Sequence, residues 1–508
     1  MTNINDKNMS AMSSGVASQS KAYKDNIKKW ELNRLLESSE ITLKDNWKKH
    51  LYIPQSWDTH SPLSIRRQNE FIDGAALFPA LKRTLDGSLG LVFRKPTKVE
   101  LVPGLEYLED DADGNGRGVE QIAQQVVREN MLQGYGCIVV DFAVNDDGVK
   151  SKAADVANNV RSTMQVYAAE SIRRVYTKKI GALSVVNQVV LSEEYEDTVD
   201  QFTVETKTQF RVLKIDDDGL YVQEVYREAS DVLGGGGSAA ASRSSTYVLY
   251  SSHEPRNSQG KRLDYMPLYF FGAESNSPTP CGSPSYDLSR MNAKHLEYSA
   301  MRNESIRQLA PTMFVFPGEN FDYDQFAEDN PQGLTMGGYN AYMPGSGGSA
   351  SIIQAAANDA AVEEMRHLES LMLQAGALLV TDATSSVSTE TTIIQRSTES
   401  SVLGMIVRNS ERCIQDAFNA VADFEGAQEG STVDINNEFF PRSLTAQDRA
   451  QWAQEVMMGL VTSTEYRDAL VKGGHLPESA LEEEIYINTD ESSDAVGDVA
   501  DDEDDDQE

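Results

Sequence analysis

Cysteine and histidine are scarce in this chain of 508 residues, which has three cysteines and six histidines. The cysteines, Cys137, Cys281 and Cys413, lie far apart, so their spacing predicts neither a disulfide framework nor a cysteine-rich zinc site. No two histidines stand one helical turn apart, as a metal-binding pair on a helix requires. His295 and His367 are expected to be packed or interfacial. We therefore expect no metal and no other cofactor.

Long apolar runs are also missing. No segment approaches the roughly 20 apolar residues of a membrane-spanning helix. The first 23 residues are polar and rich in Ser, Asn and Lys, and they lack the apolar core of a secretory signal. Together with the few cysteines, this favours a soluble chain of intracellular origin without membrane contact.

The sequence motifs of common enzyme classes do not occur either. There is no phosphate-binding glycine loop followed by Lys-Ser or Lys-Thr, and no Gly-x-Ser-x-Gly sequence for a nucleophilic serine. Carboxylates are abundant, but a chain this acidic brings some of them together by chance. We assign no catalytic residue and predict a protein that is not an enzyme.

Basic residues are few relative to acidic ones: the chain has 45 basic and 79 acidic residues, which give a net charge of −34. Residues 482–508 hold 14 acidic residues and no basic one, and the rest of the chain still carries −20. An acidic surface disfavours tight binding of nucleic acid, which depends on neutralising phosphates. It is compatible with a wall along which DNA moves without sticking. The acidic tail is predicted to be disordered.

The length exceeds that of a single core, so we expect at least two subdomains. The N-terminal part shows helical patterns with a break at Pro79. Residues 165–275 alternate apolar and polar side chains and predict a block of strands, with a hairpin turn at 216–219. Residues 234–245 are rich in Gly and Ser and predict a flexible loop.

Residues 111–116 read Asp-Ala-Asp-Gly-Asn-Gly, which matches the start of a calcium-binding loop. The twelfth position of that loop needs a bidentate glutamate, and Ile122 stands there. We therefore expect a turn that leads into a helix. This helix ends at Gly134, and a buried strand follows over 136–141.

The strongest pattern lies between residues 283 and 424. One helix begins at Ser283 and ends before Pro311, a second covers about 355–380, and a third continues to residue 424. Residues 381–392, between the second and third helices, are rich in hydroxyl groups and poor in large apolar ones. Long helices bridged by such a loop suit the wall of a channel better than a catalytic pocket.

Three arginines on the third helix, Arg396, Arg408 and Arg412, have two interpretations. They contact DNA, or they pair with carboxylates of a neighbouring subunit. We favour the intersubunit pairs, because carboxylates are in excess throughout the chain.

Eight short motifs follow one another between about residues 55 and 480. Each is a packing or turn signature, and they lie at 90–96, 111–114, 134–141, 169–174, 292–298, 389–392, 444–446 and 459–463. Their order and spacing resemble those of tailed-bacteriophage portal proteins.

The resemblance implies an α+β portal fold with an α/β wing, a long-helix stem, a small αβ clip and a helical crown. The glycine-rich loop 234–245 and the acidic tail are not part of the family pattern. In chain order, the implied parts are a disordered N-terminus 1–24, wing 25–282, stem helix 283–310, clip 311–353, stem helix 354–380, tunnel loop 381–392, wing helix and return 393–439, crown 440–480 and disordered acidic tail 481–508.

Portal proteins assemble as rings, typically of twelve copies, at one capsid vertex. The resemblance therefore implies a homo-oligomer in the virion, assembled in the host cytoplasm. Double-stranded DNA would pass through it during packaging and ejection without sequence specificity. The implied partners are the terminase packaging motor, the head-tail adaptor, and the major capsid or scaffolding protein.

The resemblance also assigns residues to two sites. The DNA-facing residues of the tunnel loop would be Thr381, Asp382, Thr384, Ser385, Ser386, Ser388, Thr389, Thr391 and Thr392. The clip residues that dock the motor or adaptor would be Phe314, Phe316, Phe321, Tyr323, Tyr339 and Tyr342.

Three other functions stay open on the sequence. One is another capsid or neck component, although the succession of helix, insert, helix and loop argues against it. Another is a metal-dependent enzyme that uses the acidic clusters near 110–120 and 320–330. The third is an acidic module that sequesters basic proteins through residues 482–508.

Overall fold

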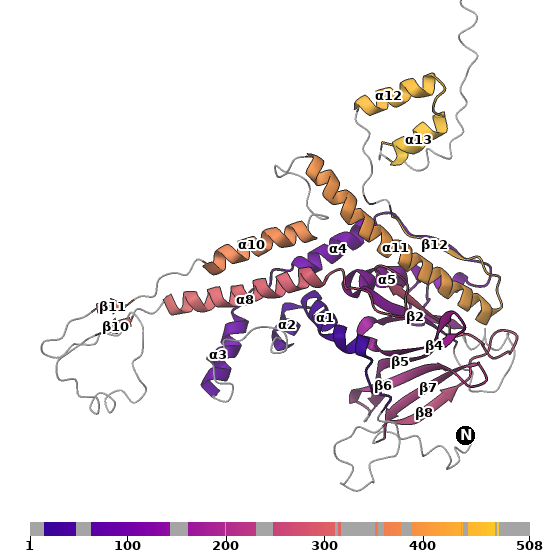
Figure 1. The fold of residues 1–508 in the computed structure, drawn as a ribbon, viewed down its shortest axis with the longest axis horizontal. Helices are drawn as coiled ribbons and strands as arrows, with labels where there is room; N and C mark the ends of the chain where they lie inside the picture. The colour runs from indigo at the N-terminus through magenta and orange to yellow at the C-terminus, as the bar shows by residue number, and fades with distance from the viewer. Residues whose placement is uncertain are drawn as a thin grey trace, which may run out of the picture. The chain divides into compact units, whose positions relative to one another are not determined.

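The chain forms two compact units, Met1–Asn437 and Glu438–Glu508. Helices and antiparallel sheets make up the fold, so the predicted α+β class is confirmed (Figure 1). Among the described helices, none is both long and apolar enough to cross a membrane. The computed structural model describes residues 15–46, 62–142, 161–198, 200–229, 247–309, 313–315, 351–353, 360–376, 389–437, 439, 446–472 and 475–476.

The helices of the first unit come in two groups along the chain. Among the residues that the structure describes, five helices precede the second sheet in sequence and three follow it. Their bounds are α1 Lys21–Glu37, α2 Glu40–Asn46, α3 Pro62–Asp73, α4 Ala80–Val92, α5 Val119–Gln133, α8 Tyr286–Leu309, α10 Ala360–Ala375 and α11 Thr389–Glu425. The second unit holds α12 Ala446–Met457 and α13 Ser463–Lys472.

A three-stranded antiparallel sheet in the order β3-β2-β9 forms the centre of the first unit. Its strands are β2 Tyr135–Phe142, β3 Ser162–Ala168 and β9 Leu268–Gly272. Helices α5 and α11 pack on this sheet and on each other. The first six residues of β2 are all buried, which means that both faces of the strand are covered. The buried strand predicted over 136–141 is thus confirmed.

A second antiparallel sheet is a five-stranded meander in the order β4-β5-β6-β7-β8. The predicted hairpin turn at 216–219 joins β6 to β7, with Gly219 at φ 80° and the Asp216 carboxylate accepting the Leu220 amide. Strand β4 lies within the block of strands predicted over 165–275, although its charged residues weaken the alternation. The strands are β4 Ile172–Ile180, β5 Leu183–Thr198, β6 Val204–Ile215, β7 Tyr221–Glu228 and β8 Tyr247–His253. The short β1 Lys98–Glu100 pairs separately with β12 Thr432–Asp434.

The predicted disorder of residues 1–24 is wrong for its second half. Residues 15–20 lie beside the second sheet, where the Ser20 amide donates to the Arg173 carbonyl, and α1 begins at Lys21. Val16 and Ala17 pack on the buried cluster around Phe210. These apolar contacts compensate for the entropy of ordering a polar segment.

The predicted break at Pro79 is confirmed, since α3 ends at Asp73 and α4 begins at Ala80. The side chain of Asn292, fully buried on α8, holds this break in place. Its Oδ1 accepts the Leu81 amide at 3.2 Å and its Nδ2 donates to the Phe78 carbonyl at 2.7 Å. Asn292 therefore supplies the cap that proline cannot provide at the start of α4.

Replacing Asn292 by alanine should lower the free energy of unfolding by about 2 kcal/mol, because two backbone groups lose their partner in a buried place. Urea denaturation measures the change. The control is Asn46→Ala, which removes an exposed side chain–backbone hydrogen bond to Thr42. That variant should lose less than about 0.5 kcal/mol. Equal losses in the two variants would show that the Asn292 cap is dispensable.

Candidate functional site

Helices α8 and α10 pack side by side as an antiparallel pair (Figure 1). His295 of α8 contacts Glu369 of α10. A methyl group added at Gly376, just after α10, would meet Leu288 near the start of α8. Residue 288 of α8 thus lies beside residue 376, and residue 295 lies beside residue 369 of α10. Because the residue numbers rise along α8 and fall along the contacting part of α10, the two helices run in opposite directions.

A two-stranded ladder joins the far ends of this pair. Strand β10, Met313–Val315, follows α8, and strand β11, Ser351–Ile353, precedes α10. They pair antiparallel with Phe314 opposite Ile352. We call α8, β10, β11 and α10 the helical arm.

The inner half of α8 is fastened to the body by short polar side chains. Ser285 donates to the Met131 carbonyl at 2.8 Å, and Ser299 accepts the Ala76 amide at 3.0 Å. Asn292 adds its two bonds to the segment before α4. These bonds to backbone groups of separate elements fix the direction in which the arm leaves the body.

His295 is packed between the arm helices, as predicted. It is 3% exposed, its ring lies 5.5 Å from that of Phe78, and its Nε2 is 3.0 Å from a carboxylate oxygen of Glu369. The Glu369 side chain is 40% exposed, so this link contributes at most about 1 kcal/mol. His367, in contrast, is exposed on α10.

Helix α10 keeps much of its apolar surface uncovered. Met372 is its one buried residue among those described, whereas Leu373 is 39% exposed. Contact with α8 therefore covers the apolar stripe of α10 in part. The half-buried members of this stripe are Val362, Met365, Leu368 and Leu371.

Two predicted boundaries near the loop 381–392 need correction. Helix α10 ends at Ala375 and Gly376 lies in a turn, so the helix predicted to reach residue 380 is too long. The physical reason is the high backbone entropy of glycine, which favours termination. Helix α11 begins at Thr389, so the last four residues of the predicted loop belong to a helix of 37 residues, about 55 Å long.

Most residues of the two predicted sites lie outside the described part of the chain. For the loop, these are Thr381, Asp382, Thr384, Ser385, Ser386 and Ser388, while Thr389, Thr391 and Thr392 lie in the first turn of α11. For the clip, Phe314 lies in β10. The other five, Phe316, Phe321, Tyr323, Tyr339 and Tyr342, are outside the described residues, and so is the glycine-rich loop 234–245.

Two of the three predicted arginines share the exposed side of α11. Arg408 and Arg412 stand four residues apart and are exposed, and Val402 and Met405 are exposed on the preceding turns. The opposite side of the helix is buried against the central sheet through Ile406, among others. The helix of Arg396 is described and its side chain is not.

The comparisons with known proteins concern this region first. A family described as a domain of unknown function (DUF4055) matches residues 284–425. The family match falls on the helical arm and α11. No curated protein matches the chain.

Among solved structures, the chain is similar to chains of a gene transfer agent (GTA) particle at 13% sequence identity in each case. One comes from the neck of the empty particle computed with C6 symmetry, with a TM-score of 0.38 over 82% of this chain and 94% of that one. Another comes from the virion of the native particle, with a TM-score of 0.36 over 84% and 96%. A third comes from the neck of the native particle computed with C12 symmetry, with a TM-score of 0.34 over 83% and 96%.

The acidic loop 111–116 forms a turn, as expected. Asp113 accepts the amides of Asn115 and Arg117 and pairs with the Arg117 guanidinium at 2.6 Å. Asp111 accepts the Gly116 amide and pairs with Arg161. The carboxylates thus serve the turn itself. Within the described ranges, no three His, Cys, Asp or Glu side chains are grouped as a metal site requires, and the cluster near 320–330 lies outside them.

Asp113 gives a pH-dependent test of this turn. Burial opposes its ionisation, but the Asn115 amide and the Arg117 side chain and amide hold the pKa of Asp113 below its ordinary value of 3.8. A carboxylate with a lowered pKa stabilises the fold above its unfolded pKa, and this contribution is lost as pH falls through the folded pKa. Asp113→Ala should cost about 2 kcal/mol at pH 7, and the difference from the parent chain should shrink below pH 3.8. Urea denaturation across pH measures it.

The control for this prediction is Asp110→Ala, which removes an exposed carboxylate from the same loop. It should change the free energy of unfolding by less than about 0.5 kcal/mol. A loss for Asp113→Ala that is unchanged from pH 7 to pH 3 would contradict the assigned role of its charge.

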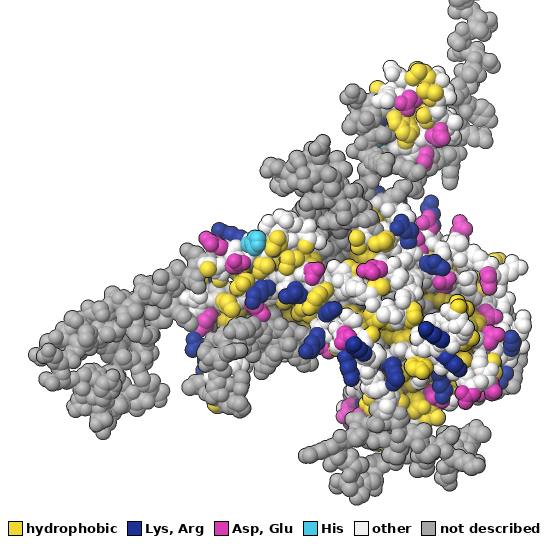
Figure 2. All heavy atoms as spheres, in the orientation of Figure 1, with side chains coloured by type: hydrophobic (Ala, Val, Ile, Leu, Met, Phe, Trp, Pro, Cys, Tyr) yellow, Lys and Arg dark blue, Asp and Glu magenta, His cyan; other side chains and the backbone are white. Residues whose placement is uncertain are grey.

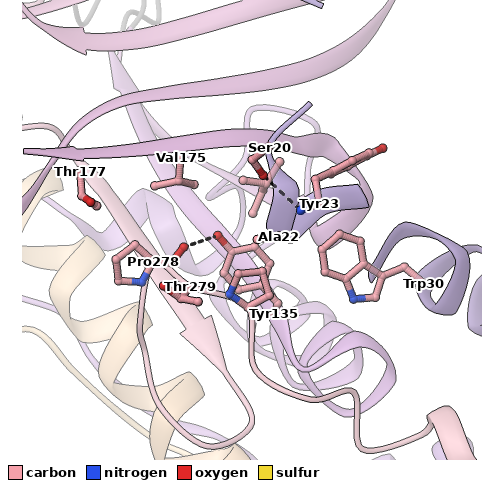
Figure 3. Close-up of a pocket in the computed structure, with 11 residues that line it drawn as sticks. Ser20, Ala22, Tyr23, Trp30, Tyr135, Val175, Thr177, Pro278 and Thr279 are labelled. Carbon is pink, nitrogen blue, oxygen red and sulfur yellow. Dashed lines mark hydrogen bonds between the residues drawn. The ribbon is translucent and has the colours of Figure 1, made fainter. Parts of the chain in front are cut away.

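A small cavity that the sequence did not indicate lies where α1, β4 and the loop 278–280 meet (Figure 3). Its volume is about 130 Å³. Trp30 and Tyr135 form part of its wall, with their rings stacked 6.2 Å apart at an angle of 12°. The Tyr135 hydroxyl donates to the Pro278 carbonyl at 2.9 Å and fixes the ring. These residues are distant in sequence, so no local sequence pattern predicts the cavity.

Proposed function

We propose that this chain is a portal protein, a ring-forming channel for double-stranded DNA at one vertex of a phage-like capsid. The observation that carries the proposal is the order of elements between 286 and 425. A helix, a two-stranded ladder, an antiparallel second helix and then a very long helix follow one another. This is the order implied for stem, clip, stem and wing helix.

The partly uncovered apolar stripe of α10 supports a homo-oligomer. Soluble proteins rarely leave adjoining apolar side chains on one helix face without a partner. In a ring, each copy offers one surface to the neighbour ahead and another to the neighbour behind. The stripe of α10 and the exposed side of α11 are suitable surfaces for such contacts.

The acidic character of the chain supports a channel that does not hold its cargo. The described residues include many exposed carboxylates, and the net charge of −34 repels the phosphate backbone. The shape of the channel would guide the DNA, and the chain would catalyse no reaction of its own. The terminase motor, the adaptor and the capsid or scaffolding protein would dock on the ring.

Imaging of the purified chain by electron microscopy, together with native mass measurement, tests the proposal. We expect a closed ring of about twelve copies with a central hole. A monomer or dimer at concentrations of tens of micromolar would overturn it. A ring with α10 on the outer rim would also overturn the assignment of the stem.

One substitution should disrupt ring assembly without changing the stability of the folded chain. Leu373→Glu places a charge on an exposed position of the α10 stripe, so the free energy of unfolding should change by less than about 0.5 kcal/mol. The fraction of chains in rings should fall at least about tenfold, since a charge in an apolar interface is costly. Native mass measurement gives the fraction. The control, Gln374→Glu, adds the same charge at the adjacent exposed position and should leave rings intact.

A further inference from the structure

Strand β5 is buried in its middle and exposed at both of its ends. Residues 189–191 are buried, whereas the first three residues of the strand and Thr198 at its end are exposed. At one end β5 forms a hairpin with β4 that turns at Gly181, and at the other end it pairs with β6 as far as Val204. On the face shown in Figure 2, hydrophobic, basic and acidic side chains all reach the surface over the region where Figure 1 places this sheet.

The hairpin of β4 and β5 carries basic and apolar side chains together. Residues 173–186 hold four basic residues and no acidic one. Ile180 lies opposite Leu183 in the ladder, and Lys178, two residues earlier, lies opposite Val185. Cross-strand partners, and residues two apart on a strand, point to the same face, so these four side chains share one face. All four are exposed, Leu183 to 70%, and we call them the basic hairpin end.

The hairpin of β5 and β6 carries the opposite charge. Residues 193–205 hold six acidic residues and no basic one. Glu194 and Glu196 lie two apart on β5, and Thr198, the next residue on the same face, lies opposite Val204. All four of these side chains are exposed. This face therefore also combines charge with an apolar group.

The turn of this second hairpin adds a large apolar side chain. Phe202 is 90% exposed. Its backbone is nevertheless held in place, because the Asp200 carboxylate accepts the amides of Phe202 and Thr203 at 2.7 and 2.8 Å. An ordered turn thus presents an aromatic ring to the solvent. We call Glu194, Glu196, Phe202 and Val204 the acidic hairpin end.

The charges of the two ends have no partners within the part of the chain that the structure describes. Lys178 forms no ion pair with a described carboxylate, and neither Glu194 nor Glu196 pairs with a described cation. The opposite face of the acidic hairpin differs, since Asp197 there pairs with Lys207 at 2.6 Å. One face of the hairpin is therefore neutralised internally, and the other keeps its charge available for a partner.

The two ends cannot meet within one chain. Strand β5 has 16 residues and separates them, which corresponds to roughly 50 Å at the rise of an extended strand. Contact between two basic ends, or between two acidic ends, would bring like charges together and is unfavourable. Each end is complementary in charge and apolar character to the other end of a different copy.

We propose that the basic hairpin end of one copy binds the acidic hairpin end of a second copy. The ammonium group of Lys178 lies beside the carboxylates, and the apolar side chains of the two ends cover each other. The contact uses two different surfaces, so its repetition builds a ring or a filament. It deepens the proposed function by naming a contact between neighbours, and it rests on that function for the closure of the ring. A DNA duplex matches the lysine alone, because phosphates leave the apolar residues of the same face uncovered.

Cross-linking of engineered cysteines tests the contact. The double variant Leu183→Cys, Val204→Cys is treated with a short bismaleimide, which cannot span the length of β5 within one chain. We expect a ladder of covalent dimers, trimers and larger species on a denaturing gel. A mixture of the two single variants should give dimers alone. Either single variant by itself should match the parent chain, whose three native cysteines set the background. Absence of the ladder in the double variant overturns the proposal.

Reversal of charge tests the electrostatic part of the contact in the same double variant. Lys178→Glu should lower the cross-linked fraction at least about tenfold, and so should Glu194→Lys with Glu196→Lys, because like charges then meet. Combining the three substitutions exchanges the charges and should restore at least about half of the yield. The control Lys98→Glu changes an exposed lysine of β1 and should alter the yield less than about twofold. Equal yields in Lys178→Glu and in the control would contradict the proposal.

Electron microscopy of the same samples separates the contact from the proposed function. Rings without the cross-linked ladder overturn the contact and leave the proposed function standing. A ladder from open filaments supports the contact and counts against a closed ring. A DNA duplex that abolishes the ladder at equimolar concentration would identify a phosphate site on the basic hairpin end and overturn the proposal.

Discussion

Replacement of Arg34 by alanine is expected to lower the free energy of unfolding by about 3 kcal/mol at pH 7, because it leaves Glu129 buried without its cation. Arg34 donates both terminal nitrogens to the Glu129 carboxylate, at 2.9 and 2.6 Å, and it also bonds Glu170 and Glu37. The Glu129 side chain is 10% exposed. Urea denaturation measures the loss.

The pH dependence of this loss has a defined sign. Burial raises the pKa of Glu129, and Arg34 opposes the rise. Without Arg34 the pKa rises further. A carboxyl with a raised pKa destabilises the fold once it ionises, so the deficit of Arg34→Ala should be largest near neutral pH and should shrink as pH falls toward 4.5.

A second substitution and a control make the test specific. Adding Glu129→Gln to Arg34→Ala should recover at least about half of the loss, because the uncompensated charge is gone. Arg66→Ala removes a pair with Glu70 between side chains that are 78% and 47% exposed, and it should cost less than about 0.5 kcal/mol. Equal losses for Arg34→Ala and Arg66→Ala would show that burial of Glu129 is unimportant.

Deletion of residues 381–388 should leave ring assembly intact and lower DNA packaging or retention by roughly tenfold or more. The sequence predicts a polar loop there, and such loops are typical places for function. The deletion stops before Thr389, where α11 begins, so it spares the helix. Packaging in a reconstituted system with capsid and motor measures the effect. Loss of the ring in this variant would contradict the proposed role of the loop.

Two matched variants support this test. One keeps the loop length and replaces Thr381, Thr384, Ser385, Ser386 and Ser388 by alanine, which removes the hydroxyl groups alone. The other deletes eight residues from the glycine-rich loop 234–245 and should leave packaging unchanged. Equal packaging in all three variants would show that the hydroxyl-rich loop does not face DNA.

Much of the secondary structure followed from local patterns. The helix that ends at Gly134 was predicted from an apolar face and a terminal glycine, and Gly134 does adopt φ 68°. Pro79 marked the break before α4, and Asp216 to Gly219 marked a hairpin. Each of these signals depends on the backbone preferences of one or two residues, which do not change with the surroundings.

Errors arose where distant contacts outweigh local preference. Residues 15–20 look disordered in sequence and yet lie on the second sheet, held by Val16 and Ala17. The deciding partners, Arg173 and Phe210, lie far away in the chain.

The sequence by itself determined the helices of the arm, the alternation of the strands, the scarcity of metal-binding residues and the acidic balance, because these depend on periodicity and composition. The tertiary structure alone decided which side chains meet. It brought Arg34 to Glu129, His295 to Glu369 and Trp30 to Tyr135. Such encounters depend on how elements pack after the chain has folded back on itself, and no local pattern of residues carries that information.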